Sequence, residues 1–342
     1  QILHPQLILR AIERLQKEFN ELETFSPSDL VCPLIQEAQT VGMFELRTSE
    51  LEKTSEVSKW INAELMGLQR RHGLEGVGLI TWDLKYREDL LSSIEPHDEG
   101  LKTDFGLSGN DFVLLLEIFL TELRKRNVLQ NMRRVNIKDA YFWPRNRPYS
   151  IRRDSVNASL SIASWIPQAS RNIRSDFLER FFYSVGRVPD KKLIGDILGD
   201  LWEFSNDNFE GIWEEVPSVN ALWGGRGSDG VVWRIRSDAW RGRLTTRNKG
   251  FHLFKCDTCG NLTHISLRGL CPSYRCPGKL TEIDPETEFA ENHYRYLYGN
   301  DPVPLSVREH TAQITKQEGA ERQRDFSNDL KPLNVLSCST TF

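Results

Sequence analysis

The sequence predicts an α+β protein of several domains, and three features of its 342 residues indicate this class. Residues 1–130 carry apolar side chains at helical spacing, residues 171–250 contain two helical patterns followed by strands, and residues 251–283 hold two pairs of cysteines. With 39% hydrophobic residues, the chain has enough apolar material for sizeable cores. We therefore expect five parts, at 1–130, 131–170, 171–250, 251–283 and 284–342.

Composition narrows the protein class. No apolar run approaches the ~18 residues that a membrane span needs, and no signal peptide is present, so we expect a cytoplasmic protein without a membrane partner. The formal net charge is only -4, but a sum near zero can hide a basic face. The chain begins without Met inside a helical pattern, and it stops just after a predicted apolar strand. We therefore expect a piece of a longer protein.

Residues 1–130 are predicted to form a mostly helical scaffold. Leu7, Ala11, Leu15 and Phe19 recur at helical spacing, and similar patterns follow at 55–71 and 110–126. Asn110 is the expected N-cap of the last of these helices. No catalytic constellation is apparent in this part.

Residues 131–170 are predicted to be a connector rich in basic and aromatic side chains, because RRVNIKDAYFWPRNRPYSIRR begins at Arg133. Cations that neutralise phosphates beside rings that stack on bases are typical of nucleic-acid contact. An equally open alternative is a loop with buried rings and solvated arginines. The candidate contacts here are Arg145, Arg147, Arg152 and Arg153.

Residues 171–250 predict a winged-helix-like module. Helices are expected at 173–183 and 191–204, and VVWRIRSDAWRGRLTT from Val231 is expected to fold into a β-hairpin. This hairpin would be a basic wing that contacts nucleic acid through Arg234, Arg236 and Arg243. The alternative is a structural or protein-contacting spacer, since this fold hosts both uses.

Residues 251–283 predict a zinc ribbon. Cys256 and Cys259 form a C-x2-C pair, and Cys271 and Cys276 form a second, looser pair. A glycine after each pair permits the tight turns with which four thiolates converge on one structural Zn²⁺ ion at about 2.3 Å. Disulfides or incidental thiols are the alternatives, and His252 and His264 are possible substitute ligands.

Residues 284–342 carry REHTAQ at 308–313, RDF at 324–326 and NVLSCSTTF at 334–342. These motifs resemble the opening of the second RecA-like lobe in large superfamily 2 DEAD/H-box helicases. Within that family, the resemblance is closer to the helicases of bacterial antiviral defence systems of the Druantia and DISARM kind. Looser similarity extends backward through LEGVGLITW, LTELRKRNVL, WRIRSDAWR, CPSYRCPG and HYRYLYG. The last part is therefore expected to be the truncated start of that lobe, with parallel strands near 304–308 and 334–339 around a helix at 316–328.

The resemblance implies an ATP-dependent helicase whose partners are DNA, the remainder of the helicase and other defence subunits. By this resemblance, nucleic-acid contacts are expected at five positions: His310, Thr311, Gln313, Ser339 and Thr341. A satisfied interior histidine is the alternative for His310. The chain lacks a GxxxxGK[ST] phosphate loop and a DExH acidic pair, so ATP and Mg²⁺ are expected only in the longer protein. The alternative function is a non-enzymatic zinc-ribbon and winged-helix adaptor.

Overall fold

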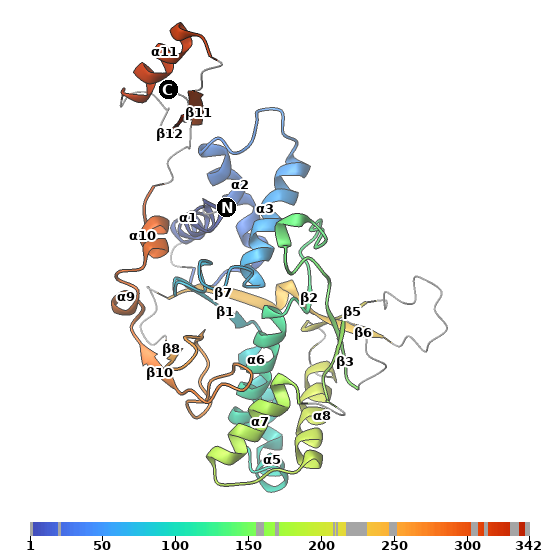
Figure 1. Cartoon of the computed structure of the whole chain (residues 1–342). Coiled ribbons are helices and arrows are strands. Elements are labelled where there is room, and N and C mark those ends of the chain that lie inside the picture. Colours follow the sequence, from blue (N-terminus) through green and yellow to red (C-terminus); the bar gives the residue numbers. More distant parts are fainter. Residues whose placement is uncertain are drawn as a thin grey trace.

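The protein combines α-helices with several small β-sheets (Figure 1). The computed structural model describes residues 3–19, 22–154, 161–167, 171–207, 209, 211–216, 231–245, 252–301, 307–310, 314–328 and 335–338. Among the helices of these ranges, none has the length and apolar character that a membrane span requires. The mixed α and β class predicted from the sequence is confirmed.

The first part of the chain is mostly helical, and its helices extend from the upper part of the view through its centre to the bottom (Figure 1). Their cores follow the apolar spacing of the sequence, since Leu7, Ala11 and Leu15 are buried, although Phe19 is exposed. The bounds are α1 Leu3–Glu18, α2 Val31–Thr40, α3 Glu50–Leu65, α4 Arg87–Ile94, α5 Asp98–Asp104 and α6 Gly109–Lys125, with a short 3-10 turn η1 at Pro27–Leu30.

The predicted N-cap of α6 is wrong by two residues. Ser108 caps this helix, because its hydroxyl accepts from the Asp111 amide while the Asp111 carboxylate accepts from the Ser108 amide. Asn110 is therefore already inside the first turn. Sequence alone offers both residues as caps, and the reciprocal pair with Asp111 decides between them.

The middle of the chain surrounds α6 with two further helices and a five-stranded sheet. The helices are α7 Ile173–Ser184 and α8 Lys191–Asp207. Strands β2, β6, β3 and β4 follow one another in the sheet, and β5 pairs antiparallel with β6. The strand bounds are β2 Leu129–Gln130, β3 Ser150–Arg152, β4 Ile162–Ser164, β5 Trp213–Val216 and β6 Val232–Arg236.

The β-hairpin predicted from Val231 onward is wrong. Strand β7, Trp240–Leu244, does not pair with β6, and instead pairs antiparallel with β1, Ile80–Leu84. A short 3-10 turn at Ser237–Ala239 carries the chain from one sheet to the other. Alternating apolar residues specify strands but not their partners, and β1 is distant in sequence. Trp82 and Trp240, one on each strand, are both fully buried.

One hydrophobic core extends across the parts expected from the sequence. Its buried residues run from Leu7 to Tyr298 and include Trp82, Trp165 and Trp240. The antiparallel pair of β1 and β7 joins residues from the first and third expected parts. Ile265 and Leu267 of the cysteine-rich segment belong to this core, which fixes the position of that segment relative to the helices, while Cys256, Cys271 and Cys276 form a small cluster of their own.

The cysteine-rich segment and the residues after it complete the chain. Strands β10, β8 and β9 form an antiparallel sheet in that order, at Leu280–Ile283, Leu253–Cys256 and Leu262–Thr263. Helices α9, Pro285–Glu288, and α10, His293–Gly299, follow.

The last described elements form a strand, a helix and a second strand. Strand β11, Val307–His310, pairs parallel with β12, Val335–Cys338, and α11, Lys316–Phe326, connects them. The register sets Val307 opposite Val335 and His310 opposite Cys338. The parallel strand–helix–strand arrangement predicted for this segment is confirmed (Figure 1).

Candidate metal centre

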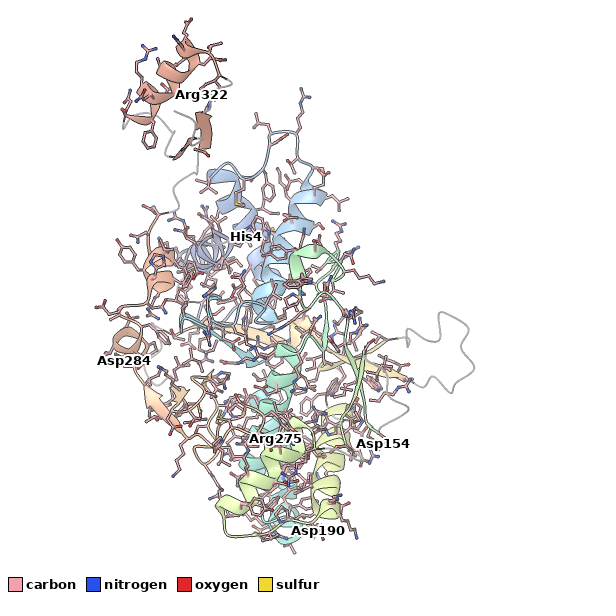
Figure 2. The ribbon with its side chains drawn as sticks, in the orientation of Figure 1. His4, Asp154, Asp190, Arg275, Asp284 and Arg322 are labelled. Atoms are coloured by element: carbon pink, nitrogen blue, oxygen red, sulfur yellow. The ribbon has the colours of Figure 1, made fainter. Side chains whose placement is uncertain are left out.

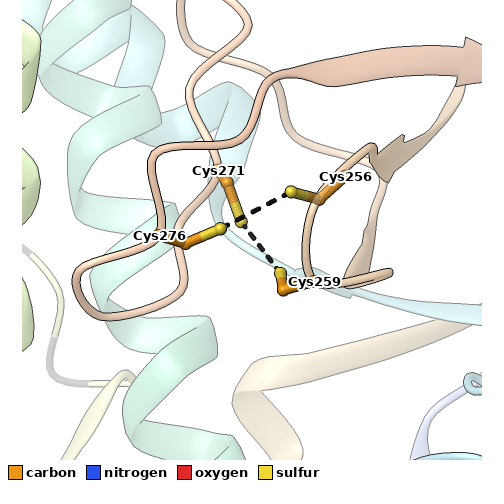
Figure 3. A group of neighbouring side chains, drawn as sticks. All are labelled: Cys256, Cys259, Cys271 and Cys276. Atoms are coloured by element: carbon orange, nitrogen blue, oxygen red, sulfur yellow. Dashed lines mark hydrogen bonds between the residues drawn. The ribbon is translucent and has the colours of Figure 1, made fainter.

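Four cysteine sulfur atoms meet in one cluster (Figure 3). All four lie within 4.8 Å of one another, with Cys256 Sγ 3.7 Å from Cys276 Sγ and Cys259 Sγ 3.5 Å from Cys271 Sγ. A tetrahedron with metal–sulfur bonds of about 2.3 Å has edges of about 3.8 Å, whereas a disulfide bond is about 2.05 Å long. The geometry therefore fits four separate thiols around one ion, such as zinc, and excludes the disulfide alternative.

Two glycines make this convergence possible. Gly260 follows the first cysteine pair with a φ of +68°, a conformation that side chains with a Cβ rarely adopt. At Gly278 the reason is space, because a Cβ there would lie 2.5 Å from Cys256 Sγ and 2.6 Å from Asp257 Oδ1. The predicted role of a glycine in a tight turn is therefore seen at Gly260, whereas Gly278 has no positive φ and is needed for space instead.

The cluster is closed on most sides. Cys256, Cys271 and Cys276 are buried, whereas Cys259 is exposed at one edge. Burial raises the pKa of the Cys271 and Cys276 thiols. Partial burial opposes ionisation of Cys259 as well, but hydrogen bonds from Ser273 and the Asn261 backbone hold its pKa to about 7. Binding of a metal cation would displace the thiol protons, so metal affinity should increase with pH.

The two histidines considered as substitute ligands are not part of the cluster. His252 is exposed and its Nδ1 lies 2.5 Å from Glu282 Oε1. His264 is buried, with its Nε2 3.1 Å from Asp83 Oδ1 and 3.7 Å from Glu117 Oε1. Burial alone would lower the pKa of His264, but these two carboxylates raise it. Both histidines therefore contact carboxylates and do not belong to the metal centre.

Arg180 on α7 attaches the second cysteine pair to the helical body. Its guanidinium donates to the carbonyl oxygens of Cys271, Cys276 and Ser273, at 2.8, 3.0 and 3.2 Å. Asp176, one turn earlier, accepts from Arg180 Nε at 3.1 Å and from the backbone amide of Arg275, labelled in Figure 2, at 2.9 Å. Backbone groups of the metal loop are thus hydrogen-bonded directly to α7.

Sequence reasoning missed this docking pair. The spacing of Asp176 and Arg180 is that of a helical i, i+4 ion pair, which is usually a solvated surface feature. Nothing local indicates that their second partners lie about a hundred residues later in the chain.

The predicted nucleic-acid contacts of the connector are largely engaged inside the protein. Arg145 donates to the carbonyls of Met66, Gly67 and Lys125, and burial lowers its pKa. Arg152 is buried in β3, and Arg153 pairs with Asp154 and Glu203 at 3.1 and 2.9 Å.

Arg147 and Trp143 are among the several exposed residues of the connector. Arg147 is exposed, and 73% of the Trp143 surface is accessible, whereas the neighbouring Phe142 ring is buried. The aromatic rings of the connector therefore differ, since Phe142 is buried and Trp143 is exposed. Trp143 alone among the described aromatic residues 141–149 combines high exposure with a large stacking surface.

The arginines predicted for a basic wing also have partners within the protein. Arg234 Nε donates to Ser150 Oγ at 3.1 Å, and burial lowers the pKa of its guanidinium. Arg236 pairs with Glu214 and Asp238 at 3.3 and 3.0 Å.

Arg243 completes this set, since its Nε lies 3.2 Å from Asp83 Oδ2. The contacts of all three arginines favour structural roles.

Of the five positions expected from the helicase resemblance, the structure describes His310 alone. His310 is the last residue of β11. Thr311, Gln313, Ser339 and Thr341 lie outside the described residues.

Comparison of the chain with protein families, with curated proteins and with solved structures finds no match in any of the three.

Proposed function

We propose that this chain is part of an ATP-dependent DNA helicase or translocase of an anti-phage defence system. In this proposal the chain supplies a structural zinc centre and DNA contacts, and leads into the second motor lobe. The parallel arrangement of β11, α11 and β12 carries the proposal. Ligands and nucleic acids bind at the carboxyl ends of parallel β-strands. In the sequence, Thr311 comes directly after β11 and Ser339 directly after β12.

The pairing of the middle sheet supports a winged-helix module within this region. Among the elements of this region, α6, β3, α7, α8, β5 and β6 follow the order expected of a winged helix, with β6 antiparallel to both β5 and β3, and the short strands β2 and β4 are additional to that order. In this assignment the wing hairpin is β5–β6. Helix α8 would occupy the position of a recognition helix.

The charge of α8 suggests that it faces protein rather than DNA. Asp196, Asp200 and Glu203 lie exposed along it. Burial and the like charges of Glu203, Asp196 and Asp104 together raise the pKa of Asp200. Such a surface repels phosphates, so the DNA contacts of this region are expected elsewhere.

Zinc is the ion that fits the four-cysteine cluster best. Thiolate ligands favour zinc over magnesium or calcium, and four of them leave no open position for a catalytic water. In the proposed protein the ion stabilises the loop that Arg180 holds against α7.

The experiment is the DNA-stimulated ATPase of the longer protein that the proposal requires. His310→Ala should lower this activity at least tenfold while leaving the thermal midpoint nearly unchanged. Ser327→Ala, at an exposed position after α11 of the same unit, is the control and should keep full activity. Equal activity of the two variants would count against the proposed role of β11.

A second candidate is a non-enzymatic adaptor that binds protein. The internal pairing of Arg153, Arg236 and Arg243 and the acidic face of α8 favour it. The adaptor predicts no salt-dependent nucleic-acid binding by the chain, whereas the helicase proposal predicts such binding.

A further inference from the structure

A polar pocket of about 490 Å³ lies away from the cysteine cluster. Its walls come from η1, from α3, from the turn after β2 and from the end of β6. Four hydroxyl side chains line it, namely Ser28, Thr54, Ser58 and Ser237. Ser58 is only 2% exposed, whereas Ser28 is exposed and Thr54 is half-buried.

Arg133 and Arg134 supply the positive charge of this pocket. Both are exposed, and within the described ranges neither forms an ion pair with an acidic side chain. The two carboxylates of the pocket, Glu214 and Asp238, both pair with Arg236. Three arginines and two acids give the lining a net charge of +1.

The backbone holds this arginine pair in an uncommon conformation. Arg134 has a φ of +71°, in the left-handed region that residues other than glycine rarely adopt. Two residues of α3 hold this turn in place. Ser55 Oγ donates to the Arg134 carbonyl at 3.3 Å, and Asn62 Oδ1 accepts from the Met132 amide at 3.1 Å. The structure thus positions the two guanidiniums beside the pocket.

Gln130 provides an unused acceptor in the same pocket. Its Oε1 is buried and has no hydrogen-bond donor among the described residues. Its strand position lies opposite Arg236 in the pairing of β2 with β6. A buried acceptor without a donor is costly, so rotation of the Gln130 amide toward a ligand that brings a hydroxyl or N–H group would relieve it.

We propose that the pocket at Arg133, Arg134, Ser58 and Gln130 binds a backbone phosphate of a nucleic acid together with a donor group of the adjoining sugar or base. This inference rests on the proposed function, because it assigns the DNA contact that the helicase requires. Arginine and hydroxyl donors suit phosphate oxygens, and Gln130 Oε1 suits the donor. The inference moves the expected DNA contact from the wing arginines to Arg133 and Arg134, which form no ion pair with an acidic side chain of the described residues.

The test is binding of the chain to a fluorescent oligodeoxythymidine of about twenty nucleotides, measured by anisotropy over a series of salt concentrations. Arg133→Glu with Arg134→Glu should weaken binding at least tenfold. The slope of log affinity against log salt should fall by about 0.7, since the loss of one single-strand phosphate contact removes about that much. Arg133→Lys with Arg134→Lys should restore most of the affinity and the slope.

The matched control is Arg70→Glu with Arg71→Glu, a second exposed pair of adjacent arginines that lies outside this pocket. This variant has the same net charge and should change affinity less than threefold. Far-ultraviolet circular dichroism and metal content verify that each variant is folded.

If the Arg133 and Arg134 reversal and the Arg70 and Arg71 reversal weakened binding equally, the pocket would be overturned, because diffuse electrostatic attraction to the oligonucleotide would explain the binding. Unchanged binding in the Arg133 and Arg134 variant, beside a wild type that binds, would overturn the pocket but leave the helicase proposal standing. A wild-type chain that binds no oligonucleotide at all would overturn both.

Discussion

Replacement of Arg180 by alanine should detach the metal loop from α7. The Arg180 side chain is 19% exposed, and its guanidinium donates to three loop carbonyls as well as pairing with Asp176. A hydrogen bond from a charged donor contributes about 1.5–3 kcal/mol, and bonds that share one guanidinium do not add fully. We therefore expect Arg180→Ala to lower the free energy of unfolding by about 3 kcal/mol.

The assay combines urea unfolding with release of zinc to a coloured chelator. If the loop must leave α7 before the ion escapes, a loss of about 3 kcal/mol accelerates release by up to about 100-fold. Arg171→Ala is the control, because the Arg171 side chain is more than half exposed and pairs with Glu179 of α7. An exposed ion pair contributes less than about 1 kcal/mol. Release at the same rate in the two variants would refute the coupling between α7 and the metal loop.

Three further outcomes are expected. Cys271→Ser should abolish stoichiometric zinc binding and unfold residues 251–283 locally, as seen by metal analysis and limited proteolysis. Burial raises the pKa of Glu64 to about 7, so its protonated carboxyl stabilises the fold below about pH 4.5, and this contribution is lost as the pH rises to about 7. Over that range the wild type should lose up to about 3 kcal/mol relative to Glu64→Gln in urea unfolding, and parallel curves would contradict this. Reversal of Arg234, Arg236 and Arg243 to Glu should lower the free energy of unfolding by about 1–3 kcal/mol for each of the more buried contacts of Arg234 and Arg243, and by less than about 1 kcal/mol for the exposed pairs of Arg236. The salt dependence of nucleic-acid binding, measured by anisotropy, should not decrease.

Local patterns in the sequence were sufficient for much of the fold. The helical spacing of Leu7, Ala11 and Leu15 predicted a buried helix face, and the short spacing within each cysteine pair predicted the cluster. The parallel strands at the end of the chain were also predictable. A strand, a helix and a strand in succession have few ways to bury both faces of the strands.

Features that depend on distant partners could not be predicted in this way. The alternation from Val231 onward gave two strands, but only the folded core selects β1 as the partner of β7. Likewise, Arg243 reads as a free surface cation until the fold brings Asp83 beside it. Arg133 and Arg134 belonged to the basic stretch from the outset, but only the pocket that they flank distinguishes them from its other arginines.

The proposed motor function is tested most directly by reading the coding sequence that follows Phe342. In the helicase family proposed for this chain, the strand before this position runs into motif V, which touches the nucleic-acid backbone and communicates with the nucleotide. The proposal predicts that an acidic residue, a glycine and an aspartate follow Phe342 in the pattern E-x-G-x-D. A stop codon, or a continuation without this pattern, would contradict the assignment of residues 284–342 to a motor lobe.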